Sequence, residues 1–274
     1  MLKPFRDESR ANKIMVPFTK ASACGNDFLI IESAHAPADL HQFSKRICDR
    51  HNGVGADGVE WLFPAQDADL YARLINADGS EAEISGNGTR CVAAYLAAGG
   101  RGEKFAIRTG AGIKVCEMVA REGGRFEFAT DMGKPEVGKE LSIQVAYGEV
   151  RGMSVSMGNP HYVVFVEEFS AAWQAEGEQI ARHHEFKQHG VNVEFVRVKS
   201  KSEIEVRFYE RGVGETQSSG TGSCASAVAS IASGRVNSPV QVHAPGGTQV
   251  VGWTGDRVTL RGAAELICRG EFFL

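Results

Sequence analysis

An internal repeat is the feature that most constrains the fold of this 274-residue chain. The segment "GNDFLII" at Gly25 resembles "GNPHYVVFV" at Gly158, 133 positions further along. In the same order, "VEW" at Val59 resembles "VEF" at Val193, 134 positions further along. Ordered matches at a nearly constant spacing indicate a duplicated unit, so we predict two lobes of the same fold.

Two later matches extend the repeat into a pair of serine-containing turns. "NADG" at Asn76 and "ERGVGE" at Glu210 are 134 positions apart, and each leads toward a serine-glycine turn. The turns themselves are "ISGNGTRC" and "SSGTGSC", whose serines Ser85 and Ser219 are also 134 positions apart. Each turn runs into an alanine-rich stretch, so the repeat places one serine at the mouth of one expected helix in each lobe.

Each lobe is expected to combine strands with one principal helix. Apolar, β-branched runs predict strands over 27–33, 161–169, 203–211 and 258–274. Alanine-rich runs closed by glycine predict helices over 90–100 and 224–234, and a weaker helix is expected over 170–184. Small side chains along the two principal helices let strands approach closely, which predicts a central buried helix in each lobe.

The predicted fold class is therefore α+β, with strands wrapped around a central helix in each of two pseudo-twofold lobes. The first lobe is expected over residues 14–133 and the second over residues 134–263. The C-terminal strand, 264–274, is expected to complete the first lobe.

Charge and composition narrow the class of partner. The formal net charge is −4 and no run of Lys or Arg is present, which argues against nucleic acid or an anionic membrane surface. No stretch reaches the ~18 apolar residues that spanning a bilayer requires, and the N-terminal segment lacks an apolar core of signal-peptide length. We therefore expect a cytoplasmic protein with a small-molecule ligand, and we leave open whether it forms a homodimer.

Cysteine and histidine spacing gives no indication of a metal site. The six cysteines are scattered and form no CxxC pair, so we expect reduced thiols that are mostly buried. In "HEFKQH" the histidines His184 and His189 are five positions apart, whereas two zinc ligands on one helical face need a spacing of four. The glycine-rich turns also lack the ending of a phosphate-binding loop. We expect neither a metal nor a cofactor.

The paired turns have two interpretations. Glycine-flanked serine at a helix start leaves unpaired amide hydrogens that suit an anion such as a carboxylate. Alternatively, each serine is only a helix N-cap, a position that serine strongly favours. The pairing favours the first interpretation, because two lobes would direct two helix N-termini toward one ligand between them.

The motifs together resemble the diaminopimelate epimerase family. The resemblance extends from about residue 18 to residue 227 and rests on "GNDF", "GVGADG", "NADGSE", "GNGTRC", "MGNPH", "GVNVEF", "ERGVGET" and "SGTGSCA". It implies a fold of two like lobes, and a cofactor-independent isomerase that inverts the α-carbon of an amino acid. In that chemistry one residue removes the proton on one face while its counterpart protonates the other.

This chain departs from the family pattern at the two catalytic positions. The family places a cysteine immediately before each glycine turn, and here Ser85 and Ser219 occupy those positions. Cys91 and Cys224 do not replace them, because they align inside the helices. A thiol has an ordinary pKa near 8.5, whereas a serine hydroxyl is a far weaker acid and needs a neighbouring base. By resemblance, His161 and Glu210 lie beside the two serines and are the candidate bases.

The resemblance also implies a set of substrate-binding residues. The amino and carboxylate groups of the substrate would be held by Asn26, Asn76, Asn159, Asn192, Glu210 and Arg211. Backbone donors to the reacting carboxylate would come from Gly86, Asn87, Gly220 and Thr221. Structural alternatives are an ordinary turn role for each asparagine and for His161, and a solvated surface position for Arg211.

Three functional hypotheses remain. The first is an epimerase acting on diaminopimelate, in lysine and cell-wall synthesis, or on a related acid. If the serines were introduced in place of cysteines, that activity belongs to the parent protein. The second is an isomerase of the same fold in which His161 or Glu210 moves the proton. The third is a binding protein that retains the amino-acid site without turnover.

Overall fold

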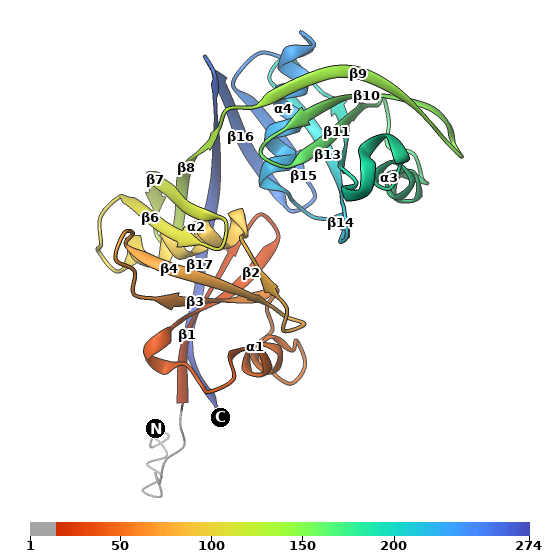
Figure 1. The fold of residues 1–274 in the computed structure, drawn as a ribbon. Helices are drawn as coiled ribbons and strands as arrows, with labels where there is room; N and C mark the ends of the chain where they lie inside the picture. Colours follow the sequence, from red (N-terminus) through yellow and green to blue (C-terminus); the bar gives the residue numbers. More distant parts are fainter. Residues whose placement is uncertain (1–14) are drawn as a thin grey trace, which may run out of the picture.

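A computed structural model describes residues 15–274, and two lobes are visible in it (Figure 1). Residue 14, the N-terminal bound of the predicted first lobe, lies outside the described residues. We define the first lobe by its elements in chain order, which are β1 (Met15–Ala23), β2 (Asn26–Glu32), η1 (Ser33–His35), α1 (Leu40–Cys48), β3 (Gly58–Phe63), β4 (Leu70–Asn76), β5 (Glu81–Ala82), α2 (Gly86–Ala98), β6 (Lys104–Thr109), β7 (Gly112–Glu122) and β8 (Arg125–Gly133).

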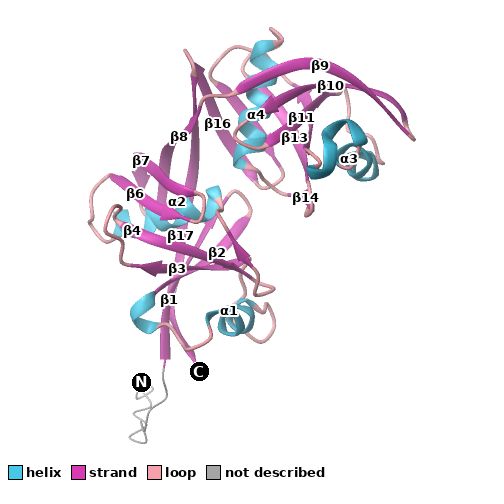
Figure 2. Cartoon of the chain, viewed as in Figure 1, coloured by secondary structure: helices cyan, strands magenta, loops and turns pink. Residues whose placement is uncertain are grey.

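The second lobe follows directly and has the same character, with strands surrounding one long helix (Figure 2). Its elements are β9 (Glu136–Val145), β10 (Gly148–Ser156), β11 (Pro160–Phe165), α3 (Trp173–Ala181), η2 (His184–His189), β12 (Asn192–Val198), β13 (Glu203–Glu210), β14 (Gly214–Thr216), α4 (Gly220–Ala232), β15 (Val240–Ala244) and β16 (Gly247–Thr254). The last strand, β17 (Arg257–Phe273), belongs to both lobes.

A small-residue helix lies at the centre of each lobe. The apolar core around α2 is built from its buried alanines and from side chains of the strands β1, β2, β4, β6, β7, β8 and β17. The core around α4 is assembled in the same way in the second lobe. Alanine and glycine have little or no side chain, so the backbones of the surrounding strands can approach the helix closely on several sides. The α+β prediction, with a central buried helix in each lobe, is confirmed.

The strand pairing reproduces the spacing of the sequence repeat. In the first lobe Phe28 of β2 lies opposite Gly58 of the parallel strand β3. In the second lobe His161 of β11 lies opposite Asn192 of the parallel strand β12. Each pair is thus related to the other by the 133-to-134-residue spacing, so these two parallel strand pairs have equivalent registers in the two lobes.

The long strand β17 ties the lobes together. Its first residues pair with β16 and its middle residues with β8, while its last residues pair with β1 from Glu265 opposite Ser22 to Phe273 opposite Met15. The predicted boundary at 263/264 therefore falls within a single strand. The exact lobe boundaries remain a prediction.

The expected helices differ from the observed ones at their ends. Both principal helices begin four residues earlier than predicted, at Gly86 and Gly220, because the glycine turns form the first helical turn. Beyond their C-termini, Gly100 and Gly234 adopt φ of 74° and 69°, as expected for glycine that closes a helix. The helix α3 is shorter than predicted. None of the described helices is long and apolar enough to cross a membrane.

Candidate active site

The two predicted catalytic serines occupy equivalent positions at the helix starts. Ser85 is the N-cap of α2, and its Oγ accepts a hydrogen bond from the amide of Gly88 at 3.1 Å. Ser219 is the N-cap of α4, and its Oγ accepts from the amide of Gly222 at 3.2 Å. Both hydroxyls are half-buried. The capping role is therefore present in both lobes, and each hydroxyl keeps its own hydrogen for donation.

Capping leaves a specific pair of donors on each helix. An α-helix provides no internal acceptor for its first amides, and each serine takes the third of them. The amides of Gly86 and Asn87 on α2, and of Gly220 and Thr221 on α4, are then the donors that the helix does not use. These four residues are the backbone donors expected from the sequence.

The N-terminus of α2 contacts the segment that leads into α4. Asn87, which is buried, donates from Nδ2 to Ser218 Oγ at 2.7 Å and to Asn26 Oδ1 at 2.8 Å. Ser218 directly precedes the N-cap serine of α4. The structure thus brings Asn87, with Asn26 bonded to it, to the helix start of the second lobe; Asn87 and Ser218 are 131 residues apart in sequence.

The backbone at Gly25 also lies close to the backbone at Gly246, next to the contact between Asn87 and Ser218. Gly25 has φ of 84°, and a Cβ placed on it would lie 2.8 Å from the Cα of Gly246. Gly246 in turn donates its amide to the carbonyl of Gln217 at 2.8 Å. Asn26, which follows Gly25, is therefore held against the segment before α4.

His161 lies in a buried polar cluster at the start of α4. Its Nδ1 is hydrogen-bonded to Glu194 Oε1 at 2.7 Å and its Nε2 to Asn159 Oδ1 at 3.0 Å. Asn159 also donates to Thr221 Oγ1 at 3.4 Å, which connects the cluster to the first turn of α4. Burial raises the pKa of Glu194, while the adjacent imidazole acts in the opposite direction. The imidazole is therefore fixed at both nitrogens.

The remaining predicted ligands lie in two places. Asn192 accepts from the amide of Arg211 at 3.1 Å and donates to the carbonyl of Pro160, and Arg211 itself is exposed. Glu210 accepts from Thr216 Oγ1 at 3.0 Å. In the first lobe, by contrast, Asn76 donates to Ser80 Oγ at 3.0 Å within its own turn. The bonds of Asn76 thus match the ordinary turn interpretation.

The two helix cysteines are packing residues, as predicted. Cys91 on α2 and Cys224 on α4 are fully buried within the two central cores. Burial raises the pKa of the Cys91 thiol and raises that of Cys224 to about 12. Cys24 is different: it is half-buried, has φ of 47°, and its Sγ lies 3.6 Å from Nη2 of the buried Arg90. No group of three or more potential metal-binding side chains occurs among the residues that the structure describes.

Two buried carboxyls, Glu60 on β3 and Glu194 on β12, are not among the residues predicted from the sequence. They occupy the same place in the repeat, 134 positions apart, and are 3% and 1% exposed. The signal that could have found them was present in the "VEW" and "VEF" match, where one acidic residue recurs inside an otherwise apolar strand.

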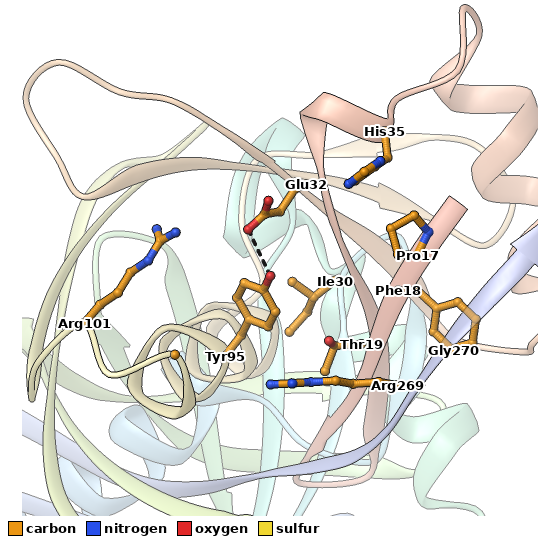
Figure 3. A pocket seen from close by; sticks show the side chains of 11 residues that line it. Pro17, Phe18, Thr19, Ile30, Glu32, His35, Tyr95, Arg101, Arg269 and Gly270 are labelled. Atoms are coloured by element: carbon orange, nitrogen blue, oxygen red, sulfur yellow. Dashed lines mark hydrogen bonds between the residues drawn. The ribbon is translucent and has the colours of Figure 1, made fainter. Parts of the chain in front are cut away.

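A hollow of about 350 Å³ lies away from these residues. It is lined in part by Arg101, Arg269, Glu32 and Tyr95, with Tyr95 donating to Glu32 at 3.0 Å (Figure 3). Tyr95 is ten residues along α2 from its N-cap, or about 15 Å at the rise of an α-helix. The hollow is therefore at the opposite end of α2 from the predicted site.

Comparison with known proteins gives one consistent family. A family model described as diaminopimelate epimerase matches residues 18–137 and 153–267. The diaminopimelate epimerase of Pelotomaculum thermopropionicum is 38% identical over 275 residues, covering 93% of this chain and 98% of that protein. The diaminopimelate epimerase of Desulforudis audaxviator is 39% identical, with the same coverage.

Solved structures share the fold at lower identity. A PhzF-family phenazine biosynthesis protein from Bacillus anthracis aligns with a TM-score of 0.71 at 15% identity, covering 95% of this chain and 99% of that chain. A hydroxyproline epimerase from Agrobacterium vitis, with bound trans-4-hydroxy-L-proline, aligns with a TM-score of 0.69 at 18% identity, covering 96% and 93%. These likenesses establish the two-lobed fold.

Proposed function

Because this chain belongs to the diaminopimelate epimerase family, we propose that it inverts the α-carbon of diaminopimelate, or of a closely related amino acid, without a cofactor. In a cell it would serve lysine and cell-wall synthesis. The observation that carries the proposal is the hydrogen bond between Asn87 and Ser218, because it joins the two serine-capped helix starts at one place.

The substrate carboxylate would be bound by the unused amides of both helices. Four such donors, two from each lobe, lie at the positive ends of the two helix dipoles, where an anion is favoured. Concentrating positive potential at the carboxylate also stabilises the enolate-like charge that develops when the α-proton leaves. The same groups therefore bind the substrate and lower the barrier to proton removal.

Proton transfer on the second-lobe side would use Ser219 with His161. A serine hydroxyl needs a base to accept its proton, and imidazole titrates near neutral pH. The bond from His161 Nδ1 to Glu194 fixes the orientation of the ring. As Ser219 takes the α-proton, its hydroxyl proton would pass to His161 Nε2, which would have to release its contact with Asn159 Oδ1 to accept it. In the reverse direction both transfers are reversed.

Isotope exchange tests the proposal. The protein is incubated with LL-diaminopimelate in deuterium oxide, and the α-proton is followed by NMR while chiral chromatography follows the meso isomer. Loss of the α-proton together with formation of the meso isomer supports epimerisation. Tight binding by calorimetry without exchange would contradict it and support a ligand-binding protein. Ser85→Cys combined with Ser219→Cys is the companion test, since failure of that variant to epimerise would contradict the substrate assignment.

The His161–Glu194 pair also favours a second candidate, in which the imidazole itself removes the α-proton. His161→Ala and Ser219→Ala separate the two schemes. If the imidazole acts directly, exchange is lost in His161→Ala and retained in Ser219→Ala. If the imidazole acts through the serine, both variants lose exchange.

A further inference from the structure

A buried carboxyl lies beneath each of the two serine-capped helices. Glu60 stands between Val59 and Trp61, both of which are fully buried, and Glu194 occupies the equivalent position in β12. An acid in the interior of an apolar strand is costly unless it is paired or protonated. The repetition of this arrangement in both lobes therefore calls for a role beyond packing.

Glu60 is directed at the first turn of α2. A Cβ placed on Gly88 would overlap Glu60 Oε1 and lie 3.3 Å from the Cβ of Ser85, so the carboxyl and the serine lie on the same side of the turn, close to Gly88. In the second lobe a Cβ on Gly222 would lie 2.9 Å from Glu194 Oε1. The second glycine of each turn thus makes room for a carboxyl next to the capping serine.

The two carboxyls differ in their partners. Glu194 is bonded to His161, but the position equivalent to His161 in the first lobe is Phe28. Among the side chains that the structure describes, Ser85 included, no hydrogen bond or ion pair to Glu60 is found, although Glu60 lies next to the turn that Ser85 caps. Ser85 therefore has no imidazole in the place that His161 occupies beside α4, and Glu60 is the acid packed against its helix turn.

The surroundings of Glu60 favour the neutral acid. Burial alone raises its pKa to about 8. Its partners on the flanking strands, Ile30 and Leu74, are uncharged. On α2 the titratable neighbour is Cys91, whose own pKa is raised by burial and by the Glu60 charge, and the preceding residue is the buried Arg90. A carboxyl in this setting can hold or release a proton near neutral pH.

We propose that Glu60 is a positioning residue that exchanges a proton with Ser85, in the role proposed above for His161 toward Ser219. This inference rests on the proposed function. When Ser85 removes the α-proton, the C–H bond breaks, an O–H bond forms on Ser85, and the original hydroxyl proton moves to the Glu60 carboxylate. In the opposite direction the neutral acid of Glu60 returns a proton to Ser85 as Ser85 protonates the carbanion. Charge and protons balance in each direction, and no oxidant or reductant is needed.

A double-mutant cycle between positions 60 and 85 tests the inference by turnover. Glu60→Gln keeps the side-chain shape and should lower kcat by about 100-fold, with KM changed by less than about threefold. In the Ser85→Cys background the same change should cost less than about tenfold, because a thiol ionises without an adjacent acid. The inflection of the wild-type kcat/KM profile near pH 8 should also disappear in Glu60→Gln. Equal losses in both backgrounds would overturn the inference.

Infrared spectroscopy tests the same contact without turnover. The difference spectrum between wild type and Glu60→Gln should contain the C=O band of a protonated carboxylic acid at neutral pH. In the Ser85→Ala background that band should shift, because the polar hydroxyl near the acid is lost from its surroundings. Glu194→Gln in place of Glu60→Gln is the matched control, and whichever carboxyl or carboxylate band it removes should not respond to Ser85→Ala. If the band is absent, or does not change in the Ser85→Ala background, the inference is refuted, even if the protein is found to epimerise diaminopimelate. If the band shifts, the inference is supported, even if no substrate is turned over.

Discussion

Replacing Glu60 by glutamine should change how the stability of the protein depends on pH. The pKa of this buried carboxyl is raised from an ordinary value of 4.5 to about 8. An acid with a higher pKa in the folded state binds more protons when folded than when unfolded. Its contribution is therefore fully present below about pH 4.5, and stability falls as the pH rises from there through about 8. Glutamine does not titrate, so Glu60→Gln should lack this loss.

The size of the effect follows from the shift. Each pKa unit corresponds to about 1.4 kcal/mol, so the carboxyl makes the wild type roughly 5 kcal/mol less stable at alkaline pH than at acidic pH. Between about pH 5.5 and 7.5 the difference in unfolding free energy, Glu60→Gln minus wild type, should grow by about 3 kcal/mol. Glu194 titrates in the same direction but is present in both proteins, so it cancels in this difference.

Urea unfolding followed by circular dichroism at a series of pH values measures this quantity directly. The test does not depend on the absolute stability of the variant, because it compares how the unfolding free energies of the two proteins change with pH. Parallel curves for wild type and variant would show that Glu60 is ionised in the folded protein at neutral pH, and would refute the argument from burial.

Other side chains give simpler tests. Gly88→Ala should lower stability by about 1–3 kcal/mol, because the methyl group would overlap the buried carboxyl; Gly86→Ala meets nothing within 4 Å and should leave the melting temperature nearly unchanged. Asn87→Ala should cost about 1–3 kcal/mol and speed amide exchange in segment 217–218, and unaltered exchange there would contradict a contact between the lobes. Iodoacetamide should modify the exposed Cys268 in the native protein and the buried Cys91 only after unfolding, as mass spectrometry can establish.

Local sequence signals were sufficient for the principal helices and the two-lobed plan. The signals used were serine before glycine, alanine-rich runs and closing glycines. Each depends only on residues within one or two helical turns, so it predicts a helix without knowledge of the tertiary structure. The repeat then supplied the arrangement of lobes. The helix Leu40–Cys48 was not predicted, because its sequence is largely polar and its helix signals are an Asp39 cap and four buried positions.

The site was predictable as a set of residues but not as a geometry. The bond between Asn87 and Ser218 depends on how the lobes pack, which no local pattern records. Glu60 was overlooked for a different reason: a lone acid in a strand resembles a solvent-facing position, and only its burial on both faces of the sheet distinguishes it. Catalytic roles for the serines, His161 and Glu210 remain predictions.

The placement of β17 has a consequence for biosynthesis. The hydrogen-bonding partner of residues 15–22 is the stretch 265–273, so this pairing cannot form until the later stretch has been synthesised. The edge of β1 that faces β17 stays uncovered during translation, although its other edge can pair with β2 early. We therefore expect the first lobe to remain incomplete and accessible to chaperones until residues 265–273 have left the ribosome, after which the β1–β17 pairing completes it.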